Sequence, residues 1–272
     1  MTWSRFRGSE TPDSQTCYTS DFYAGTVHGA LESARIILAL LFEIYRPQSV
    51  LDVGCGQGAW LAAAEELGCA RLVGIDGHWV QPRAMLSANI EFIAADLERT
   101  LPLQRHFDLC ISLEVAEHLS ADRAHSFVQD LCAASDLVLF SAAISLQGGT
   151  NHTNEQWQSF WAELFARSGY NCYDFFRPVL WRDGRVESWY RQNALLYVKA
   201  PHPIAEPLKA AALGRGPLDI VHPEIYAGNL ETLQRAMSSP SLSLCTHLCS
   251  RWTINKLQAL GTWLRGKADF VI

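Results

Sequence analysis

At residues 50–58 the chain reads Val50-Leu51-Asp52-Val53-Gly54-Cys55-Gly56-Gln57-Gly58, and its organisation can be inferred outward from there. The apolar half is typical of a buried strand. The glycines that follow allow a sharp turn into a helix, with no Cβ atoms to keep a ligand away from the backbone. Such a turn lies at the carboxyl edge of a parallel sheet, where ligands bind beside the first amides of the next helix. An ordinary strand-to-helix turn is the alternative that needs no ligand.

Two acidic residues end or follow the next two predicted strands. Asp76 ends the apolar run at residues 72–76 and lies 22 residues after Gly54. A carboxylate at that position can accept hydrogen bonds from both ribose hydroxyls of a nucleotide. Asp96, followed by Leu97, is placed to meet an adenine amino group. Either acid alone could be a helix cap or a turn residue, but with the glycine turn they indicate one nucleoside-sized groove.

Strand-like and helix-like segments alternate along the chain, which indicates parallel βαβ units with helices on both faces of one sheet. The predicted strands are residues 49–53, 71–75, 90–94, 107–113, 136–141, 171–176 and 193–199. The predicted helices are residues 21–45 (broken or bent at Gly25 and Gly29), 58–67, 81–88, 121–134, and one that runs to about residue 168 from a capping box at 153–156. A polar loop is expected between the last two strands. The predicted fold class is therefore α/β.

An NAD-dependent dehydrogenase is one alternative, because Gly54, Gly56 and Ala59 also fit the G-x-G-x-x-A pattern of dinucleotide-binding proteins. Three features favour another cofactor. Asp52 lies inside the strand, where its carboxylate can order the turn or meet an ammonium group. The glycine pattern continues to Gly58. The strand pattern ends with two strands after one more helix, and not with a second mononucleotide-binding half.

The glycine turn, Asp76, Asp96-Leu97 and the sequence ISLEVAEH at residues 111–118 together resemble the successive motifs of class I S-adenosylmethionine-dependent methyltransferases. The resemblance covers roughly residues 30–200. It implies a Rossmann-like, mostly parallel seven-stranded sheet whose last strand is antiparallel, with S-adenosylmethionine as cofactor. Asp52 and the glycines would flank the methionine part, Asp76 would hold the ribose, and Asp96 with Leu97 would frame the adenine. The predicted cofactor-binding residues are Asp52, Gly54, Gly56, Gly58, Asp76, Gly77, Asp96, Leu97 and Leu113.

A polar cluster follows the fourth predicted strand, at the edge to which the methyl group should point. Glu114, Glu117 and His118 would share one face of a helix, because residues three and four apart are neighbours there. His152, in the loop after the fifth strand, is expected to join them. The cluster has three interpretations. His118 or His152 deprotonates an acceptor hydroxyl, all four residues bind a divalent metal ion, or the acids only stabilise the local structure.

The predicted reaction is methylation of a small molecule or saccharide, at oxygen. The Glu-x-x-Glu-His pattern with a later histidine also resembles small-RNA 3′-terminal 2′-O-methyltransferases, so a metal-dependent RNA 2′-O-methyltransferase is an alternative. A net charge of −6 argues against nucleic acid as a partner. A non-catalytic binding module with the same fold is the alternative outside enzymes. Residues proposed for the acceptor pocket are Tyr18, Phe22, Tyr23, His28, Trp157, Phe160, Trp161, Arg177, Trp181, Trp189, Tyr190 and Arg191, although the helical spacing of Trp157, Phe160 and Trp161 favours core packing.

Three segments are predicted: a lid at residues 1–30, the methyltransferase domain at 31–200 and a helical extension at 201–272. Residues 242–264 have an amphipathic pattern that suits packing on the domain, on a partner or on a membrane surface. The first residues have no signal-peptide pattern, and residues 36–42, the longest apolar stretch, are too short to cross a membrane. With eight scattered cysteines, this indicates a reducing cytoplasm. The oligomeric state is not indicated.

Overall fold

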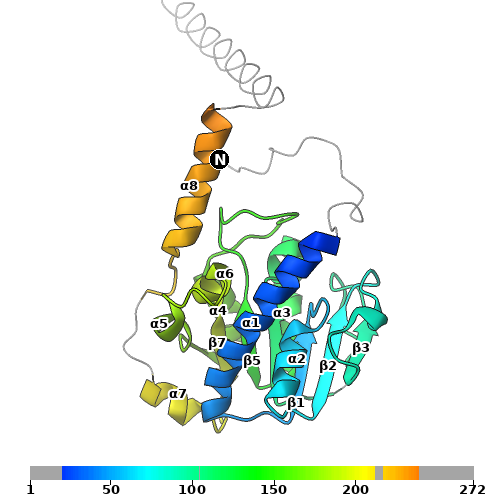
Figure 1. Cartoon of the computed structure of the whole chain (residues 1–272). Coiled ribbons are helices and arrows are strands. Elements are labelled where there is room, and N and C mark those ends of the chain that lie inside the picture. The colour runs from blue at the N-terminus through cyan, green and yellow to red at the C-terminus, as the bar shows by residue number, and fades with distance from the viewer. Residues whose placement is uncertain (1–19, 104, 212–216, 239–272) are drawn as a thin grey trace, which may run out of the picture. The chain divides into compact units, whose positions relative to one another are not determined.

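The computed structural model describes residues 20–103, 105–211 and 217–238 (Figure 1). The chain forms two compact units, residues 1–225 and 226–272. The sheet and the candidate site belong to the first unit. Among the described helices, none combines the length and the apolar character that a membrane crossing requires. The division expected at residues 30/31 and 200/201 stays a prediction.

Seven strands form one sheet in the order β3-β2-β1-β4-β5-β7-β6. The strands are β1 (Ser49–Val53), β2 (Arg71–Asp76), β3 (Ile90–Ala94), β4 (Leu109–Leu113), β5 (Leu137–Ser141), β6 (Tyr170–Tyr173) and β7 (Leu195–Lys199). Strands β1 to β5 pair in parallel, and β7 is antiparallel to both β5 and β6. The predicted α/β sheet with an antiparallel last strand is confirmed. The insertion of β7 between β5 and β6 differs from the 3-2-1-4-5-6 order of dinucleotide-binding folds, which argues against the dehydrogenase alternative.

Helices cover both faces of the sheet (Figure 1). On one face α1 (Ser20–Ile44) and α2 (Ala59–Glu66) bury Leu41 and Leu61 against it. On the other face α3 (Ala124–Ala134) and α4 (Gln158–Arg167) bury Phe127 and Phe165. The remaining helices are α5 (Arg177–Leu180), α6 (Ser188–Asn193), α7 (Ala205–Ala211) and α8 (Pro223–Ser238), with 3₁₀ turns η1 (Pro82–Ala84), η2 (Ala116–His118) and η3 (Ala121–Arg123).

The alternation of side chains along the strands places three predicted cofactor residues, Asp52, Asp76 and Leu113, on one face, whereas Leu97 packs in the core of the other face. In β1, Val50 packs in the α1/α2 core, whereas Leu51 and Val53 pack in the α3/α4 core. Because side chains alternate with a period of two, Asp52 lies on the α1/α2 face. The same alternation places Asp76 of β2 there. Leu113 at the end of β4 is part of the α1/α2 core.

The expected interruption of the first helix at Gly25 and Gly29 is wrong, because α1 is continuous from Ser20 to Ile44. Gly29 instead makes room for a neighbouring segment. A Cβ atom on Gly29 would lie 2.2 Å from Oε1 of Glu187. The backbone N–H of Glu187 also donates to Ser33 Oγ, at 3.0 Å. Tertiary packing therefore outweighs the low helix propensity of glycine here.

The capping box expected at residues 153–156 does not form, since α4 begins at Gln158. Thr153 is used elsewhere. Its hydroxyl donates to the carbonyl of Leu119 at 2.9 Å, and its N–H donates to the carbonyl of Glu117 at 2.8 Å. These bonds join the β5–α4 loop (residues 142–157) to the β4–α3 loop (residues 114–123). The polar loop expected between β6 and β7 is also different, because it forms helices α5 and α6.

Candidate active site

The glycine turn after β1 is built on left-handed backbone. Gly54, Gly56 and Gly58 have φ values of 84°, 51° and 79°, which favour glycine. Gly54 is also required by packing, because a Cβ atom there would lie 2.2 Å from Cγ2 of Val115. A Cβ atom on Gly56 would meet no atom within 4 Å. The backbone at Gly56 is therefore open to a ligand, while Gly54 brings the turn close to the β4–α3 loop.

Asp76 joins the turn to the end of β2. Its two carboxylate oxygens accept hydrogen bonds from the backbone N–H groups of Gly56 at 2.7 Å and Gly77 at 2.6 Å. Burial raises the pKa of this carboxyl group, and the two hydrogen bonds partly oppose that shift. The ribose-binding role of Asp76 stays a prediction. The structure does place the carboxylate at the turn, where it holds two loops together.

Asp52 is a buried acid with an unsatisfied oxygen. The residue is 2% exposed, and its Oδ2 atom has no hydrogen-bond partner among the described residues. Burial raises the pKa of Asp52 well above its ordinary value, and the negative charge of Asp76 raises it further. A buried carboxyl group without a partner is costly, so this position suits a ligand that brings a positive charge or a donor.

The third acid, Asp96, is exposed and forms local contacts. Its Oδ1 atom accepts a hydrogen bond from the Glu98 N–H at 3.0 Å, and Oδ2 lies 3.4 Å from Nε of Arg99. Leu97 beside it is buried. The N–H of Ala95 donates to the carbonyl of Asp76 at 2.8 Å, which brings this loop to the same sheet edge. The structure thus brings all three predicted places to one edge, and their role in binding adenine and ribose stays a prediction.

Sequence reasoning missed Trp79 at this edge. Its indole ring occupies the space beside Gly77, where a Cβ atom would lie 2.2 Å from Cη2 of the ring. The side chain is 68% exposed, which is unusual for tryptophan. The signal that could have found it is its position three residues after Asp76.

The segment after β4 does not begin the regular helix that was expected. Glu114 has a left-handed φ of 55°, which is uncommon for a residue other than glycine. Its N–H donates to the carbonyl of Ser141 at 3.0 Å, and a 3₁₀ turn then covers residues 116–118. Glu114 therefore does not share a helical face with Glu117 and His118. The break follows the close packing of Val115 against Gly54.

Three of the four predicted catalytic residues nevertheless converge. Ligating atoms of Glu117, His118 and His152 all lie within 4.8 Å of one another. Two backbone bonds align the loops that carry them, because the N–H groups of Thr153 and Asn154 donate to the carbonyl of Glu117 at 2.8 and 3.0 Å. Glu114 is not among these three, and the four-residue metal set stays a prediction.

Burial controls the protonation of the cluster. Glu117 is fully buried, and neither of its carboxylate oxygens has a hydrogen-bond partner in the part of the chain that the structure describes. Burial raises the pKa of Glu117 well above its ordinary value, and the charge of Glu114 adds to the shift. Desolvation lowers the pKa of His118 to about 4, with a further contribution from His152, even though His118 is the most exposed of the three. His118 is therefore a neutral imidazole near neutral pH.

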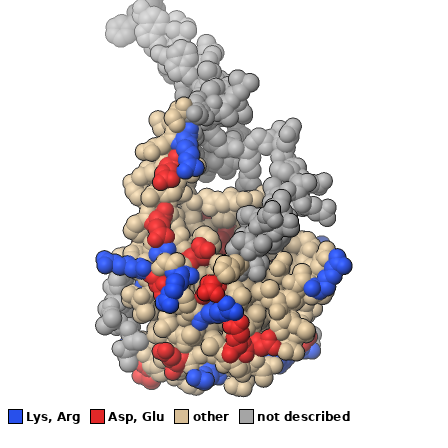
Figure 2. Space-filling model, viewed as in Figure 1, with Lys and Arg blue, Asp and Glu red and all other residues tan. Residues whose placement is uncertain are grey.

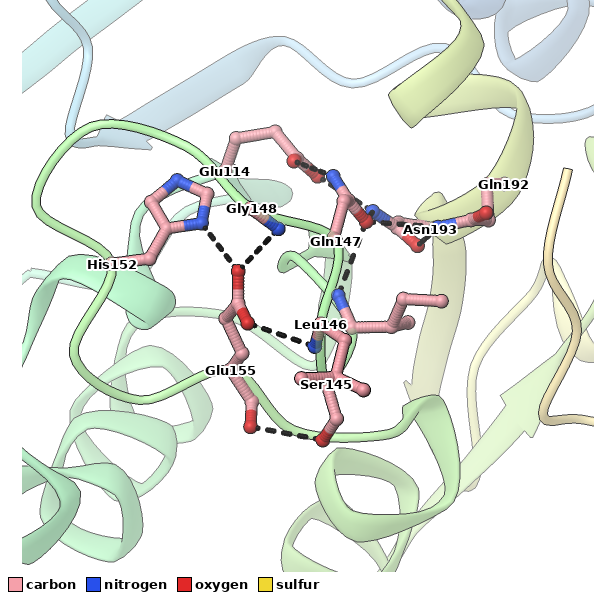
Figure 3. A network of polar contacts seen from close by, with 10 residues as sticks. Glu114, Ser145, Leu146, Gln147, Gly148, His152, Glu155, Gln192 and Asn193 are labelled. Carbon is pink, nitrogen blue, oxygen red and sulfur yellow. Dashed lines mark hydrogen bonds and ion pairs between the residues drawn. The ribbon is translucent and has the colours of Figure 1, made fainter. Parts of the chain in front are cut away.

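Glu114 belongs to a network of amide side chains instead (Figure 3). Its carboxylate accepts hydrogen bonds from Nδ2 of Asn193 at 3.3 Å and from Nε2 of Gln147 at 3.5 Å. Gln192 joins the network through a 2.8 Å bond to Oε1 of Gln147. Burial raises the pKa of Glu114, and the bonds from Ser141 and Asn193 partly oppose this. Sequence reasoning missed the three amides, which come from the β5–α4 loop and α6.

A second carboxylate organises the other side of the same loop. Glu155 lies against His152, with its Oε1 atom 3.0 Å from Nδ1 of the ring. Burial would raise the pKa of Glu155, but hydrogen bonds from His152 and from the N–H groups of Gly148 and Leu146 outweigh this and lower it. Glu155 was not among the predicted site residues.

The charged and aromatic residues expected to lie exposed near the acceptor are mostly structural. Arg177 and Arg191 are 2% and 4% exposed and donate to backbone carbonyls, Leu218 and Trp181 among them. Arg177 and Trp181 line a cavity of about 720 Å³, and none of Glu117, His118 and His152 lines it. Tyr190 is buried against Trp60, with ring centroids 5.2 Å apart.

The helical aromatic group divides between core and surface. Trp161 is 1% exposed and belongs to the α3/α4 core, as its spacing suggested, whereas Trp157 is 40% exposed. Of the proposed lid residues, His28 is exposed. Tyr18, the side chains of Phe22 and Tyr23, and the amphipathic pattern at residues 242–264 lie outside the described residues.

Comparisons with known proteins agree with this geometry. The family model described as "Methyltransferase domain" matches residues 50–135, from β1 through α3. No curated protein sequence matches the chain. Among solved structures, an O-methyltransferase family protein from Burkholderia thailandensis is similar in fold, with a TM-score of 0.50 and 12% identity over 66% of this chain and 57% of that one.

Two further solved structures match with lower TM-scores. Magnesium protoporphyrin IX methyltransferase from Synechocystis PCC 6803, with bound SAH, has a TM-score of 0.47 and 19% identity over 65% of this chain and 88% of that one. The methyltransferase domain of bacterial CtHen1-C has a TM-score of 0.48 and 16% identity over 62% of this chain and 98% of that one.

Proposed function

Because this chain belongs to the class I S-adenosylmethionine-dependent methyltransferases, we propose that it methylates an oxygen atom of a small-molecule or saccharide acceptor. The reaction is an in-line displacement at the methyl carbon, so much of the catalysis can come from positioning the two reactants. An oxygen nucleophile must also lose a proton, which calls for a base or a metal ion beside it. The observation that carries the proposal is the convergence of Glu117, His118 and His152 at the carboxyl edge of the sheet.

The residues around the glycine turn fit the cofactor. S-adenosylmethionine supplies a methyl group that is already activated by the sulfonium charge. Gly56 leaves open space beside its backbone, which suits close approach of the ligand. Asp52 has a buried oxygen that no described residue bonds, which suits the ammonium group of the methionine part. Asp76 lies at the turn to accept from the ribose hydroxyls, with its orientation fixed by Gly56 and Gly77.

The same chemistry supports a divalent metal ion held by Glu117, His118 and His152. A fully buried carboxyl group is costly in the free chain when neither of its oxygens has a hydrogen-bond partner among the described residues, as in Glu117. Two imidazoles close to it complete a donor set that suits Mg, Mn, Fe or Zn. A bound cation would polarise an acceptor hydroxyl and lower its pKa. In its absence the neutral His118, with its pKa lowered to about 4, is a weak base.

A metal-dependent RNA 2′-O-methyltransferase is the second candidate, and the three converging ligands favour it as well. Charge distribution favours the small acceptor. On the face shown in Figure 2, Lys and Arg are interspersed with Asp and Glu among the described residues and form no continuous basic surface. Several of the cations are paired, as Arg35 is with Glu32 and Glu66 at 2.7 Å. RNA binding usually needs a basic face.

We also propose a cytoplasmic location, which is supported by the state of the cysteines. The five described cysteines, Cys55, Cys69, Cys110, Cys132 and Cys172, are free thiols, and three of them are buried. Free thiols persist in reducing compartments.

Two measurements test the proposed function. Calorimetry should show binding of S-adenosylhomocysteine and none of NAD, and the reverse result would contradict the cofactor assignment. Transfer of labelled methyl groups should then be measured with phenolic, carboxylic and saccharide acceptors and with a short RNA carrying a free 3′ end. We expect methylation of a small acceptor, lost in EDTA and restored by a divalent ion. Methylation of the RNA alone would favour the second candidate, and full activity in EDTA would remove the metal ion from the proposal.

A further inference from the structure

The β5–α4 loop that carries His152 has an unusual backbone. Leu146, Gly148, Gly149 and Asn151 all have positive φ values, of 69°, 77°, 153° and 59°. For a residue other than glycine, a left-handed conformation is unfavourable and persists only where the surroundings fix it. A loop with this conformation needs strong local bonds to stay in one place.

Glu155 provides these bonds from a single carboxylate (Figure 3). Its Oε2 atom accepts from the N–H of Leu146 at 2.9 Å, and its Oε1 atom accepts from the N–H of Gly148 at 2.8 Å. Its own carbonyl accepts from the hydroxyl of Ser145 at 3.2 Å. The two ends of the loop are thereby closed on one another.

The same carboxylate reaches the catalytic candidate. Oε1 of Glu155 lies 3.0 Å from Nδ1 of His152. A carboxylate can only accept a hydrogen bond, so Nδ1 must carry the proton. In the neutral ring Nε2 then keeps its lone pair and is the nitrogen that remains for the cluster with Glu117 and His118.

Gly149 fixes the ring from another side. A Cβ atom on Gly149 would lie 2.3 Å from Cε1 and 2.4 Å from Nε2 of His152. The ring therefore packs directly on the glycine backbone. The neighbouring Gly148 has no such contact within 4 Å. The methyl group of Gly149→Ala would therefore displace the His152 ring, whereas that of Gly148→Ala would not.

We propose that Glu155 is a positioning residue that closes the β5–α4 loop and holds His152 with Nδ1 protonated and Nε2 free for the reaction. The inference rests on the proposed function for the role of His152 in methyl transfer. Carboxylate partners of this kind raise the basicity of imidazole and orient it, and their loss typically costs about 10–100-fold in metal affinity or activity.

Nitrogen-15 NMR of the full chain labelled at histidine tests the tautomer directly. His152 is assigned by comparison with His152→Ala. In the native chain its Nδ1 should be protonated and its Nε2 unprotonated. In Glu155→Ala the ring should shift to the Nε2-protonated form that histidine favours in water, and in Glu155→Gln, which keeps one accepting oxygen, it should be mixed. Glu163→Ala, an exposed residue of α4 paired with Arg167, is the matched control and should leave the tautomer unchanged. An unchanged tautomer in both Glu155 variants would overturn the inference.

A second set of measurements separates positioning from general destabilisation. For both Glu155 variants we expect unchanged affinity for S-adenosylhomocysteine. Affinity for Mn²⁺ should fall by about 10–100-fold, and kcat should fall by a similar factor with little change in KM. Both losses should be smaller for Glu155→Gln than for Glu155→Ala. Gly149→Ala should lose Mn²⁺ affinity more than Gly148→Ala does. Equal losses of Mn²⁺ affinity in Gly149→Ala and Gly148→Ala would contradict a role of Gly149 in positioning the His152 ring. A native chain that neither binds Mn²⁺ nor transfers methyl groups would end the proposed function, while the tautomer comparison would still decide this inference.

Discussion

The rings of His118 and His152 meet edge to face, with centroids 4.8 Å apart and an angle of 87° between their planes. The two residues come from loops that follow different strands, β4 and β5, which are parallel neighbours in the sheet. Their contact is therefore a product of topology and not of sequence distance. The charge of a protonated His152 makes protonation of His118 less favourable, as like charges do.

The pKa of His118 should be well below its ordinary value of 6.5 in the native chain, at about 4. Desolvation is the main cause and His152 the second, so His152→Ala should raise the pKa of His118. Proton NMR titration of the His118 ring measures both. A value of 6.5 or higher in the native chain would contradict the described packing. Because the unfolded chain binds more protons at His118 between these two pH values, the contribution of His118 to the free energy of unfolding should fall as the pH drops from 6.5 toward 4, and His118→Ala should remove that contribution.

Substitutions at the glycine turn should separate packing from ligand access. Alanine at Gly54 or Gly56 must adopt a left-handed conformation, at a cost of about 1–2 kcal/mol. Gly54→Ala also overlaps Val115, so its free energy of unfolding should fall further than that of Gly56→Ala. Gly56→Ala should instead lose affinity for S-adenosylhomocysteine. Thermal unfolding and calorimetry measure the two effects. Val115→Ala should partly restore the stability of Gly54→Ala, and no restoration would argue against the overlap.

Asp52→Asn should stabilise the free chain at high pH and weaken the cofactor complex. The pKa of Asp52 is raised in the folded chain, so above its ordinary value of 3.8 the unfolded chain releases a proton that the folded chain retains. The contribution of Asp52 to the free energy of unfolding therefore declines as the pH rises from about 4, and asparagine removes this decline. Denaturation at pH 4 and pH 8 should show equal stabilities at the lower pH and a more stable variant at the higher one.

The same acid predicts a pH dependence of binding. An ammonium group beside Asp52 favours the ionised form of its carboxyl group. Binding of S-adenosylhomocysteine should therefore release a proton from Asp52, and the affinity should rise with pH over the range in which Asp52 titrates. Calorimetry in buffers of different ionisation enthalpy detects that proton. Proton release that persists in Asp52→Asn would contradict the assignment.

Gln147 should be important for stability as well as for the site. Its Oε1 atom accepts hydrogen bonds from the N–H of Ile144 at 3.1 Å, Nε2 of Gln192 at 2.8 Å and Nδ2 of Asn193 at 3.1 Å. Gln147→Leu leaves these donors without that partner, and unsatisfied buried donors cost about 1–3 kcal/mol. Chemical denaturation should show a loss of at least this size. Gln81→Leu, at an exposed position, is the control and should change stability by less than about 0.5 kcal/mol.

Local patterns were sufficient to predict the first half of the sheet and its turn. An unbroken apolar run predicts a strand that is buried on both faces, as Val50, Leu51 and Val53 are. The three glycines of the turn predict left-handed backbone, which glycine adopts more easily than other residues. The order of these signals along the chain predicted the edge at which they meet. Their positions follow from the parallel pairing of β1 with β2 and of β2 with β3, which are consecutive in the sequence.

What could not be predicted depends on contacts between distant segments. The left-handed Glu114 follows from the packing of Val115 on Gly54, 61 residues earlier in the chain. Gly29 remains helical because Glu187 packs against it. The partners of Glu114 come from residues 147 and 193, and no periodicity connects them. At Gly29 this tertiary contact outweighs a local preference against glycine in a helix of about 1 kcal/mol.

The placement of β7 has a consequence for the order in which the chain can fold. At the end of the sheet, β6 has β7 as its one neighbouring strand, and β7 follows it in the sequence. During translation β6 therefore cannot join the sheet until residues 195–199 have left the ribosome. The pairing of the parallel strands β1 to β5 does not involve these residues, so it can form earlier, and β6 and β7 then extend the sheet on the side to which α6 brings Asn193.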